Sequence, residues 1–198
     1  MDKKIQTIDT YNKSAQALEK KFDDLGARIF DIEEVFKLLD KVNNKVVEIG
    51  CGNGRDAEEI IKRTNDYVGI DISTELIKLA QKKVPKGKFL VADVTSFEFP
   101  EKIDIVFAFA SLIHVNKEDL INVLDKIHKS LNSKGILRMS MKYSDEYKEV
   151  TKEDEFGVRT YYHYSKNDIK ELAYKFHLVK NDENDLRGQK WIEILLQK

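Results

Sequence analysis

The sequence predicts an α/β fold: an open, doubly wound sheet of seven mostly parallel strands, with one antiparallel strand and an N-terminal helical cap. Helical apolar spacing in the first 40 residues gives way to short β-branched runs that alternate with helical stretches, a pattern typical of parallel strands joined by helices. The run 103–110 is almost continuously apolar, as in a strand buried on both faces. The length of 198 residues fits one domain.

Two helical stripes precede the first predicted strand. Tyr11 and Leu18 belong to the first stripe, and Ile29 and Phe36 belong to the second, with Gly26 between them. Because both stripes come before any strand, we expect them to pack as a cap on the sheet.

Seven short apolar runs are the predicted strands. In chain order they cover 45–50, 67–71, 89–93, 103–110, 136–141, 178–182 and 191–196. Helices are predicted at 57–63 and after Ser73, Asn116 and Ser165, whose side chains are suited to cap a helix N-terminus. The last two strands follow each other directly, so we expect them to form a hairpin that brings the one antiparallel strand into the sheet.

A loop with glycine at alternate positions, Gly50, Gly52 and Gly54, follows the first strand. Without Cβ atoms, the backbone of such a loop can approach a ligand closely. Asp71 ends the second strand, 21 residues beyond Gly50, where a carboxylate can accept hydrogen bonds from both hydroxyls of a ribose. The strand before and the helix after the loop favour a nucleotide-like ligand over a simple tight turn.

The loop departs from two common phosphate-binding patterns. The dinucleotide fingerprint needs glycine where Arg55 stands, and no Gly-Lys-Ser/Thr of a P-loop follows. The carboxylate of Glu48 beside the glycines would repel a pyrophosphate. It suits a ligand that has an ammonium group and no phosphate.

The chain resembles the class I S-adenosylmethionine-dependent methyltransferases over nearly its whole length, and small bacterial methyltransferases most of all. The motifs that carry the resemblance lie at 46–54, 69–73, 91–94, 104–111 and 131–137. Three further matches to the small bacterial enzymes are Tyr11–Ala15, Ser111–Val115 and Trp191–Leu195. The resemblance implies a Rossmann-like sheet.

The resemblance also implies S-adenosylmethionine as the cofactor, bound without a metal. Glu48 would contact its ammonium group, Asp71 its ribose hydroxyls and Asp93 its adenine amino group. The other implied cofactor-binding positions act through backbone or packing: Gly50, Cys51, Gly52, Gly54, Ile72, Val94, Phe109 and Ala110.

A single methyltransferase domain over 1–198 is expected from the same resemblance. Its parts are a helical cap (1–42), a cofactor-binding core (45–142), a lid insert over the acceptor (143–164) and a C-terminal helix and strand pair (165–198). The aromatic residues of the insert either shape an acceptor pocket or form a strand or turn with one buried face.

Several acceptor classes are disfavoured by the residues present. The fourth strand is not followed by the Asn/Asp-Pro-Pro-Tyr of amino-methylating DNA enzymes, and the only thiol, Cys51, lies in the glycine loop rather than near strand four. Acidic metal ligands are missing at 107–111 and 137–141. We therefore expect a small-molecule acceptor. The alternatives are an RNA or protein methyltransferase, or a protein that binds S-adenosylmethionine without catalysis.

Charge and hydropathy bear on partners and location. Thirty-four Lys and Arg residues balance 35 Asp and Glu residues, whereas a protein that mainly binds nucleic acid usually carries a basic surplus. The longest uncharged run, 105–116, is too short to span a membrane. With a single cysteine and no apolar leader pattern, we expect a cytoplasmic protein with no membrane or nucleic-acid partner.

His114 and Tyr11 are the candidate catalytic residues. Methyl transfer can rely on alignment of the acceptor alone, but a base is needed when the acceptor loses a proton. His114 lies a few residues beyond strand four, and the ordinary histidine pKa near 6.5 suits a base at neutral pH. Tyr11 would hydrogen-bond to His114 or to the acceptor if its helix closes over the site. The alternative is that His114 only packs at the start of a loop.

Overall fold

The computed structural model describes residues 2–39, 41–186 and 188–198. Its strands are β1 (Lys45–Ile49), β2 (Asp66–Asp71), β3 (Lys88–Val91), β4 (Ile103–Phe109), β5 (Leu131–Tyr143), β6 (Lys148–Asp154), β7 (Gly157–Tyr164), β8 (His177–Leu186) and β9 (Gln189–Gln197). Its helices are α1 (Lys3–Lys13), α2 (Ala15–Leu25), α3 (Ile29–Leu38), α4 (Ala57–Ile61), α5 (Thr74–Lys83), α6 (Lys117–Ser130) and α7 (Lys166–Leu172), with a 3₁₀ turn η1 (Leu112–His114).

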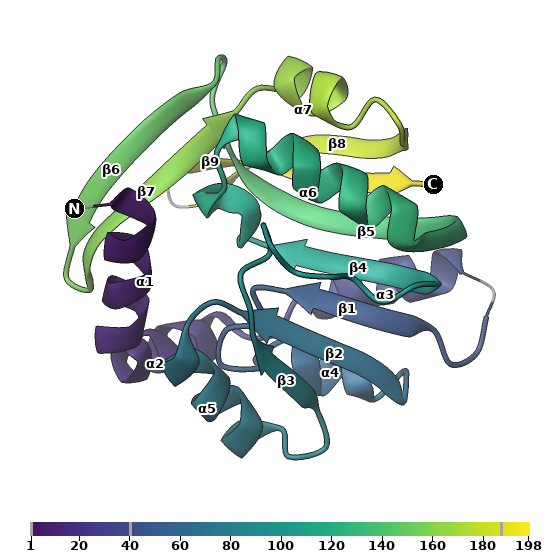
Figure 1. Ribbon diagram of the computed structural model, residues 1–198, viewed down its shortest axis with the longest axis horizontal. Coiled ribbons are helices and arrows are strands. Elements are labelled where there is room, and N and C mark those ends of the chain that lie inside the picture. The colour runs from purple at the N-terminus through teal and green to yellow at the C-terminus, as the bar shows by residue number, and fades with distance from the viewer. Residues whose placement is uncertain (1, 40, 187) are drawn as a thin grey trace.

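All these strands belong to one sheet, and the prediction of a mostly parallel, doubly wound sheet is confirmed. Strands β3, β2, β1, β4 and β5 lie side by side in that order and are parallel. Strand β9 runs antiparallel to β5 from Ile136 to Lys142 and pairs with β8, as expected for the C-terminal hairpin. Figure 1 shows this sheet with helices on both of its faces.

The predicted number of seven strands is too low. Residues 148–164, expected as a lid insert, form the hairpin β6–β7, which joins the sheet through a short parallel pairing of Lys142 with His163 and Tyr143 with Tyr164. β-Branched residues in both arms, Val150 and Thr151 in β6 and Val158 and Thr160 in β7, favour this extended conformation. The described residues therefore contain nine strands in the sheet.

Two apolar cores cover the two faces of the sheet. Leu120 and Leu124 of α6 pack against one face, and Ile32 of α3 and Ile60 of α4 pack against the other. The predicted helix caps are confirmed: the side chains of Ser73, Asn116 and Ser165 accept hydrogen bonds from the first turns of α5, α6 and α7. Each cap satisfies a backbone N–H that has no partner within its own helix.

The N-terminal segment forms three helices rather than the two that the stripes predicted, because the first stripe is interrupted at Ser14. Helix α1 lies along β7 (Figure 1). The Thr10 hydroxyl donates to the Val158 carbonyl at 2.7 Å, and the Thr7 hydroxyl accepts from the Thr160 N–H at 3.1 Å. These bonds fix α1 at the carboxyl edge of the parallel strands. No helix in the described part of the chain is long and apolar enough to cross a membrane.

Candidate functional site

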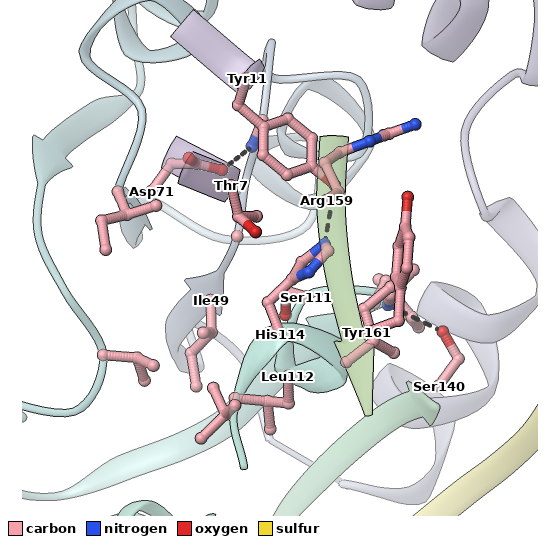
Figure 2. Close-up of a pocket in the computed structure, with 18 of the residues that line it drawn as sticks. Thr7, Tyr11, Ile49, Asp71, Ser111, Leu112, His114, Ser140, Arg159 and Tyr161 are labelled. Carbon is pink, nitrogen blue, oxygen red and sulfur yellow. Dashed lines mark hydrogen bonds between the residues drawn. The ribbon is translucent and has the colours of Figure 1, made fainter. Parts of the chain in front are cut away.

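A cavity of about 570 Å³ opens at the carboxyl ends of the parallel strands, the position where open α/β sheets bind ligands. Its volume is within the roughly 300–1,000 Å³ range of small-molecule sites. We call its two parts the loop end, formed by Gly50–Gly52, Asp71, Asp93 and Phe109–Ser111, and the hairpin end, formed by the residues Lys142, Lys152, Asp154, Arg159–Tyr161, Gln189 and Trp191. Figure 2 shows Tyr11 and His114 between Asp71 and Tyr161.

The glycine loop turns sharply and exposes its backbone to the cavity. Gly50 has a φ of +70°, and a Cβ atom on it would lie 2.2 Å from the Cβ of Ser111. Gly52 also has a positive φ, of +55°. Only glycine fits at position 50, for reasons of both conformation and space. Gly54 does not line the cavity among the described residues; it packs instead against Ala80 of α5.

Asp71 faces the cavity at the end of β2. Its two carboxylate oxygens accept from the backbone N–H groups of Gly52 at 3.0 Å and Ser73 at 2.8 Å. Burial raises the pKa of this carboxyl, although these backbone donors oppose the shift. A carboxylate offers about four acceptor sites, so Asp71 can still accept from ligand hydroxyls.

Asp93, beyond the end of β3, lines the cavity and is held by the N-terminal helix. Lys4 of α1 forms an ion pair with it, and Thr95 donates to it from both its N–H at 3.0 Å and its hydroxyl at 2.8 Å. Partial burial alone would raise the pKa of Asp93, but these partners outweigh burial and lower it. Helix α1 therefore contacts both the loop end of the cavity and strand β7.

Most of the predicted cofactor-binding residues meet in this cavity. Those at its surface are Gly50, Cys51, Gly52, Asp71, Ile72, Asp93, Val94, Phe109 and Ala110, together with the two predicted catalytic residues Tyr11 and His114. Glu48 and Gly54 are not among the described residues that line it.

The expected contact of Glu48 with an ammonium group stays a prediction, and Glu48 is not at the cavity surface among the described residues. Glu48 is 2% exposed and accepts a hydrogen bond from the Tyr67 hydroxyl. Burial and the nearby charge of Asp56 raise the pKa of Glu48 to about 8. The acidic side chain that reaches the cavity beside the loop is Asp56.

Two cavity residues were missed by the sequence reasoning. Arg28 donates to Asp56 through its N–H at 2.8 Å and its Nη1 at 2.6 Å, and its guanidinium lies 4.9 Å from the Phe109 ring centre. The Ser111 Oγ is buried and has no hydrogen-bond partner among the described residues. Ser111 lay within a recognised motif, whereas Arg28 stands in a helix connection with no local signal.

Tyr11, His114 and Thr160 form a hydrogen-bonded chain. The Tyr11 Oη lies 2.8 Å from the His114 Nε2, and the His114 Nδ1 lies 2.6 Å from the Thr160 carbonyl oxygen. A carbonyl only accepts, so Nδ1 carries the proton and the Nε2 lone pair accepts from the Tyr11 hydroxyl. Burial lowers the pKa of His114 to about 4, well below the ordinary value on which the sequence argument relied, and the charges of Arg159 and Lys142 add to this.

The hairpin end combines aromatic rings with cations. Tyr161 lies with its ring centre 4.8 Å from that of His114, and the ammonium group of Lys142 lies 3.9 Å from the same ring centre of Tyr161. Trp191 of β9 completes this end. The insert thus forms a hairpin whose second strand, β7, is buried at the consecutive residues Arg159–Tyr161, and these residues also line the cavity.

The described residues contain no group of three or more side chains placed to hold a metal ion.

Comparisons with known proteins agree with this geometry. The family model of the methyltransferase domain matches residues 46–135. The chain is 31% identical over 147 residues to malonyl-(acyl-carrier protein) O-methyltransferase 2 of Ilyobacter polytropus, covering 71% of this chain and 52% of that protein. It is 30% identical over 138 residues to the ubiquinone biosynthesis O-methyltransferase of Aliivibrio fischeri, covering 59% of this chain and 58% of the relative. The chain thus spans about half the length of these relatives.

A solved structure extends the likeness to the whole fold. Magnesium protoporphyrin IX methyltransferase from Synechocystis, solved with bound S-adenosylmethionine, superposes with a TM-score of 0.72 at 15% identity and covers 100% of this chain and 98% of that one. At this identity the likeness concerns the fold alone. Taken with the family match over the glycine loop and strands β1 to β4, it leads to one conclusion: the chain belongs to the class I S-adenosylmethionine-dependent methyltransferases.

Proposed function

We propose that this protein transfers a methyl group from S-adenosylmethionine to a small-molecule acceptor, without a metal ion. The observation that carries the proposal is that one cavity joins the glycine loop and Asp71 to the Tyr11–His114 pair. A cofactor at the loop end and an acceptor at the hairpin end would then meet beside Tyr11.

The loop end suits S-adenosylmethionine in shape and in donor set. The backbone of Gly50 and Gly52 leaves open space that side chains would fill, and Asp71 can accept from the ribose hydroxyls. The unpartnered hydroxyl of Ser111 offers a donor to the methionyl carboxylate. Asp93 supplies an acceptor for the adenine amino group.

The size of the cavity supports a small acceptor. The relatives are named for a malonyl carrier protein, for ubiquinone biosynthesis and for magnesium protoporphyrin IX, so family likeness alone leaves the acceptor open. A single cavity of about 570 Å³ must hold both the cofactor and the acceptor's reacting part.

S-adenosylmethionine, when bound, supplies an electrophilic methyl group on a positively charged sulfur. The chain's own residues align the acceptor and exclude water, which lowers the barrier without further chemistry. Where the acceptor loses a proton, Tyr11 receives it as the new bond to carbon forms and passes its own proton to the Nε2 of His114. The Thr160 carbonyl fixes the tautomer that leaves this nitrogen free to accept.

A turnover screen tests the proposal. Purified protein is incubated with S-adenosylmethionine and pooled small molecules in EDTA, and release of S-adenosylhomocysteine is followed. We expect release that depends on at least one pool and is unchanged by EDTA. Release only with RNA or protein pools, or a dependence on added metal, would contradict the proposal, and binding without release in any pool would indicate a non-catalytic protein.

A further inference from the structure

The hairpin end carries more positive than negative charge. Lys142, Lys152 and Arg159 line it, and within the described part of the chain only Arg159 of these three forms an ion pair, with Asp154. Among the described residues no carboxylate lies within ion-pair distance of Lys142, whose ammonium donates to the neutral Gln189 Oε1 at 3.2 Å. Two cations of this end, Lys142 and Lys152, therefore have no counter-ion among the residues that the structure describes.

Glu193 does not supply the missing charge, although it also lines the cavity. Its carboxylate lies 3.3 Å from the fully buried guanidinium of Arg138. Asp154, the hairpin acid that lines the cavity, is likewise committed to Arg159.

Two of the cations are removed from solvent. Arg159 is 6% exposed, and its Nε is buried without a hydrogen-bond partner among the described residues. Lys142 is half-buried, and its burial, with the charges of Lys152 and Arg159, lowers its pKa to about 8. Buried charges and donors are costly unless they are paired, so this arrangement favours an anionic partner.

The two cations flank one aromatic ring. The Lys142 ammonium lies 3.9 Å and the Arg159 guanidinium carbon 5.7 Å from the Tyr161 ring centre. Lys142 lies two residues beyond Ser140, whose hydroxyl accepts from the Ala110 N–H at 3.0 Å. At the rise of a β-strand, this places Lys142 about 7 Å farther from the loop end than Ser140.

We propose that the methyl acceptor is a small organic acid whose carboxylate binds Lys142 and Arg159 while its reacting atom lies at Tyr11. This inference rests on the proposed function and names the substrate class of the same cavity. The planar guanidinium suits a carboxylate, and the rings of Tyr161 and Trp191 offer apolar surface to the rest of the molecule.

Binding of an acid has a consequence for His114. The charges of Arg159 and Lys142 oppose protonation of its imidazole. A carboxylate beside these cations offsets their charge, so the pKa of His114 rises when an acid binds. The base then becomes stronger only when an acceptor is in place.

The test compares acids with their neutral amides. Benzoate and benzamide, and 4-hydroxybenzoate and 4-hydroxybenzamide, are titrated by ligand-observed NMR into the full chain, with and without S-adenosylhomocysteine. We expect each acid to bind at least about 10-fold tighter than its amide, and Lys142→Met to reduce this preference about 3- to 10-fold. Lys142→Arg keeps the charge and retains the preference, as does the control Lys62→Met at the exposed end of α4. The histidine signals show a raised pKa of His114 with the acids and not with the amides.

Equal binding of acids and amides by the wild-type chain would overturn the inference, and so would an equal preference in Lys142→Met and Lys62→Met. Thermal melts establish that each variant is folded. Calorimetry with S-adenosylhomocysteine keeps the two proposals apart: cofactor binding without an acid preference contradicts this inference alone, and an acid preference without cofactor binding contradicts the proposed function.

Discussion

The two ends of the cavity differ in how the chain builds them. The loop end uses residues that directly follow successive strands, from Gly50 after β1 to Ser111 after β4. The hairpin end brings together Lys142 of β5, Arg159 of β7 and Trp191 of β9, and Tyr11 of α1 lies between the two ends, although these residues are far apart in the chain. The loop end is therefore set by local turns, whereas the hairpin end exists only once the sheet and its cap have assembled.

The two ends also differ in charge. At the loop end, Asp71 is a carboxylate with no ion pair among the described residues, whereas Asp93 is paired with Lys4. At the hairpin end, Lys142 and Lys152 are cations with no ion pair among the same residues, whereas Arg159 is paired with Asp154. This difference suits a cationic cofactor at one end and an anionic acceptor at the other. The two ends should accordingly respond differently to substitution, with loop-end changes affecting cofactor binding and hairpin-end changes affecting the acceptor and turnover.

The largest effect is expected from His114→Ala. The substitution removes the acceptor of the Tyr11 proton, so turnover at saturating S-adenosylmethionine should fall at least about 100-fold, within the usual range for a general base. Cofactor affinity, measured by calorimetry, should stay within about twofold. His177→Ala, at an exposed position of β8, serves as the control. Near-normal turnover in His114→Ala would mean that alignment alone provides the catalysis.

Gly50→Ala should damage the loop end through both strain and overlap. The new Cβ would meet the Ser111 Cβ at 2.2 Å, with φ at +70°. We expect a loss of about 2–5 kcal/mol in the free energy of unfolding, measured with urea. Gly188→Ala is a matched control, because Gly188 has a φ of +78° and nothing within 4 Å. It should lose only about 1–2 kcal/mol. Equal losses would mean that the contact with Ser111 has no cost.

Asp71→Ala should weaken cofactor binding and leave the binding of acids at the hairpin end unchanged. Loss of charge-assisted hydrogen bonds worth about 1.5–3 kcal/mol lowers affinity about 10- to 100-fold. The control is Asp66→Ala, at the exposed start of the same strand. Calorimetry with S-adenosylmethionine measures both variants, and an unchanged affinity in Asp71→Ala would remove this residue from the binding site.

The smallest effects per pH unit have opposite directions for His114 and Glu48. The pKa of His114 is lowered to about 4, so its stability contribution is present above pH 6.5 and is lost as the pH falls through 4. The pKa of Glu48 is raised to about 8, so its contribution is present below pH 4.5 and is lost as the pH rises through 8. Each slope is below about 1.4 kcal/mol per pH unit.

Urea unfolding of His114→Gln and Glu48→Gln between pH 4 and pH 9 measures these contributions. Relative to the wild type, His114→Gln should lose less stability on acidification, and Glu48→Gln should lose less at alkaline pH. Parallel curves for the wild type and both variants would contradict the assigned shifts.

The sequence predicts the loop end well because its signals are local. Asp71 is identified by a strand end, by its distance from Gly50 and by the capping Ser73 that follows. Glu48 is adjacent to the same loop, but no local signal indicates that its side chain is buried against Tyr67. The residue lies on the strand face opposite to Val47 and Ile49, where Tyr67 covers it.

The hairpin end and the Tyr11–His114 pair beside it could be predicted only in part. Tyr11 and His114 were found through their place in recognised motifs, but the lowered pKa of His114 depends on burial by β7 and on two distant cations. In the sequence, Lys142 is simply a polar residue that follows the predicted strand 136–141. Its position in the cavity depends on the short pairing of β5 with β7, at Lys142 and Tyr143 only. No periodic pattern in the sequence specifies that pairing.

The most direct test of the account is calorimetric titration of the wild-type chain with S-adenosylmethionine in the presence of EDTA. The central claim is that the loop end binds this cofactor with the chain's own residues and no metal ion. We predict one molecule bound per chain, with no change on addition of divalent metal and no competition from NAD. An absence of binding, binding that requires metal, or binding of NAD in its place would contradict the account.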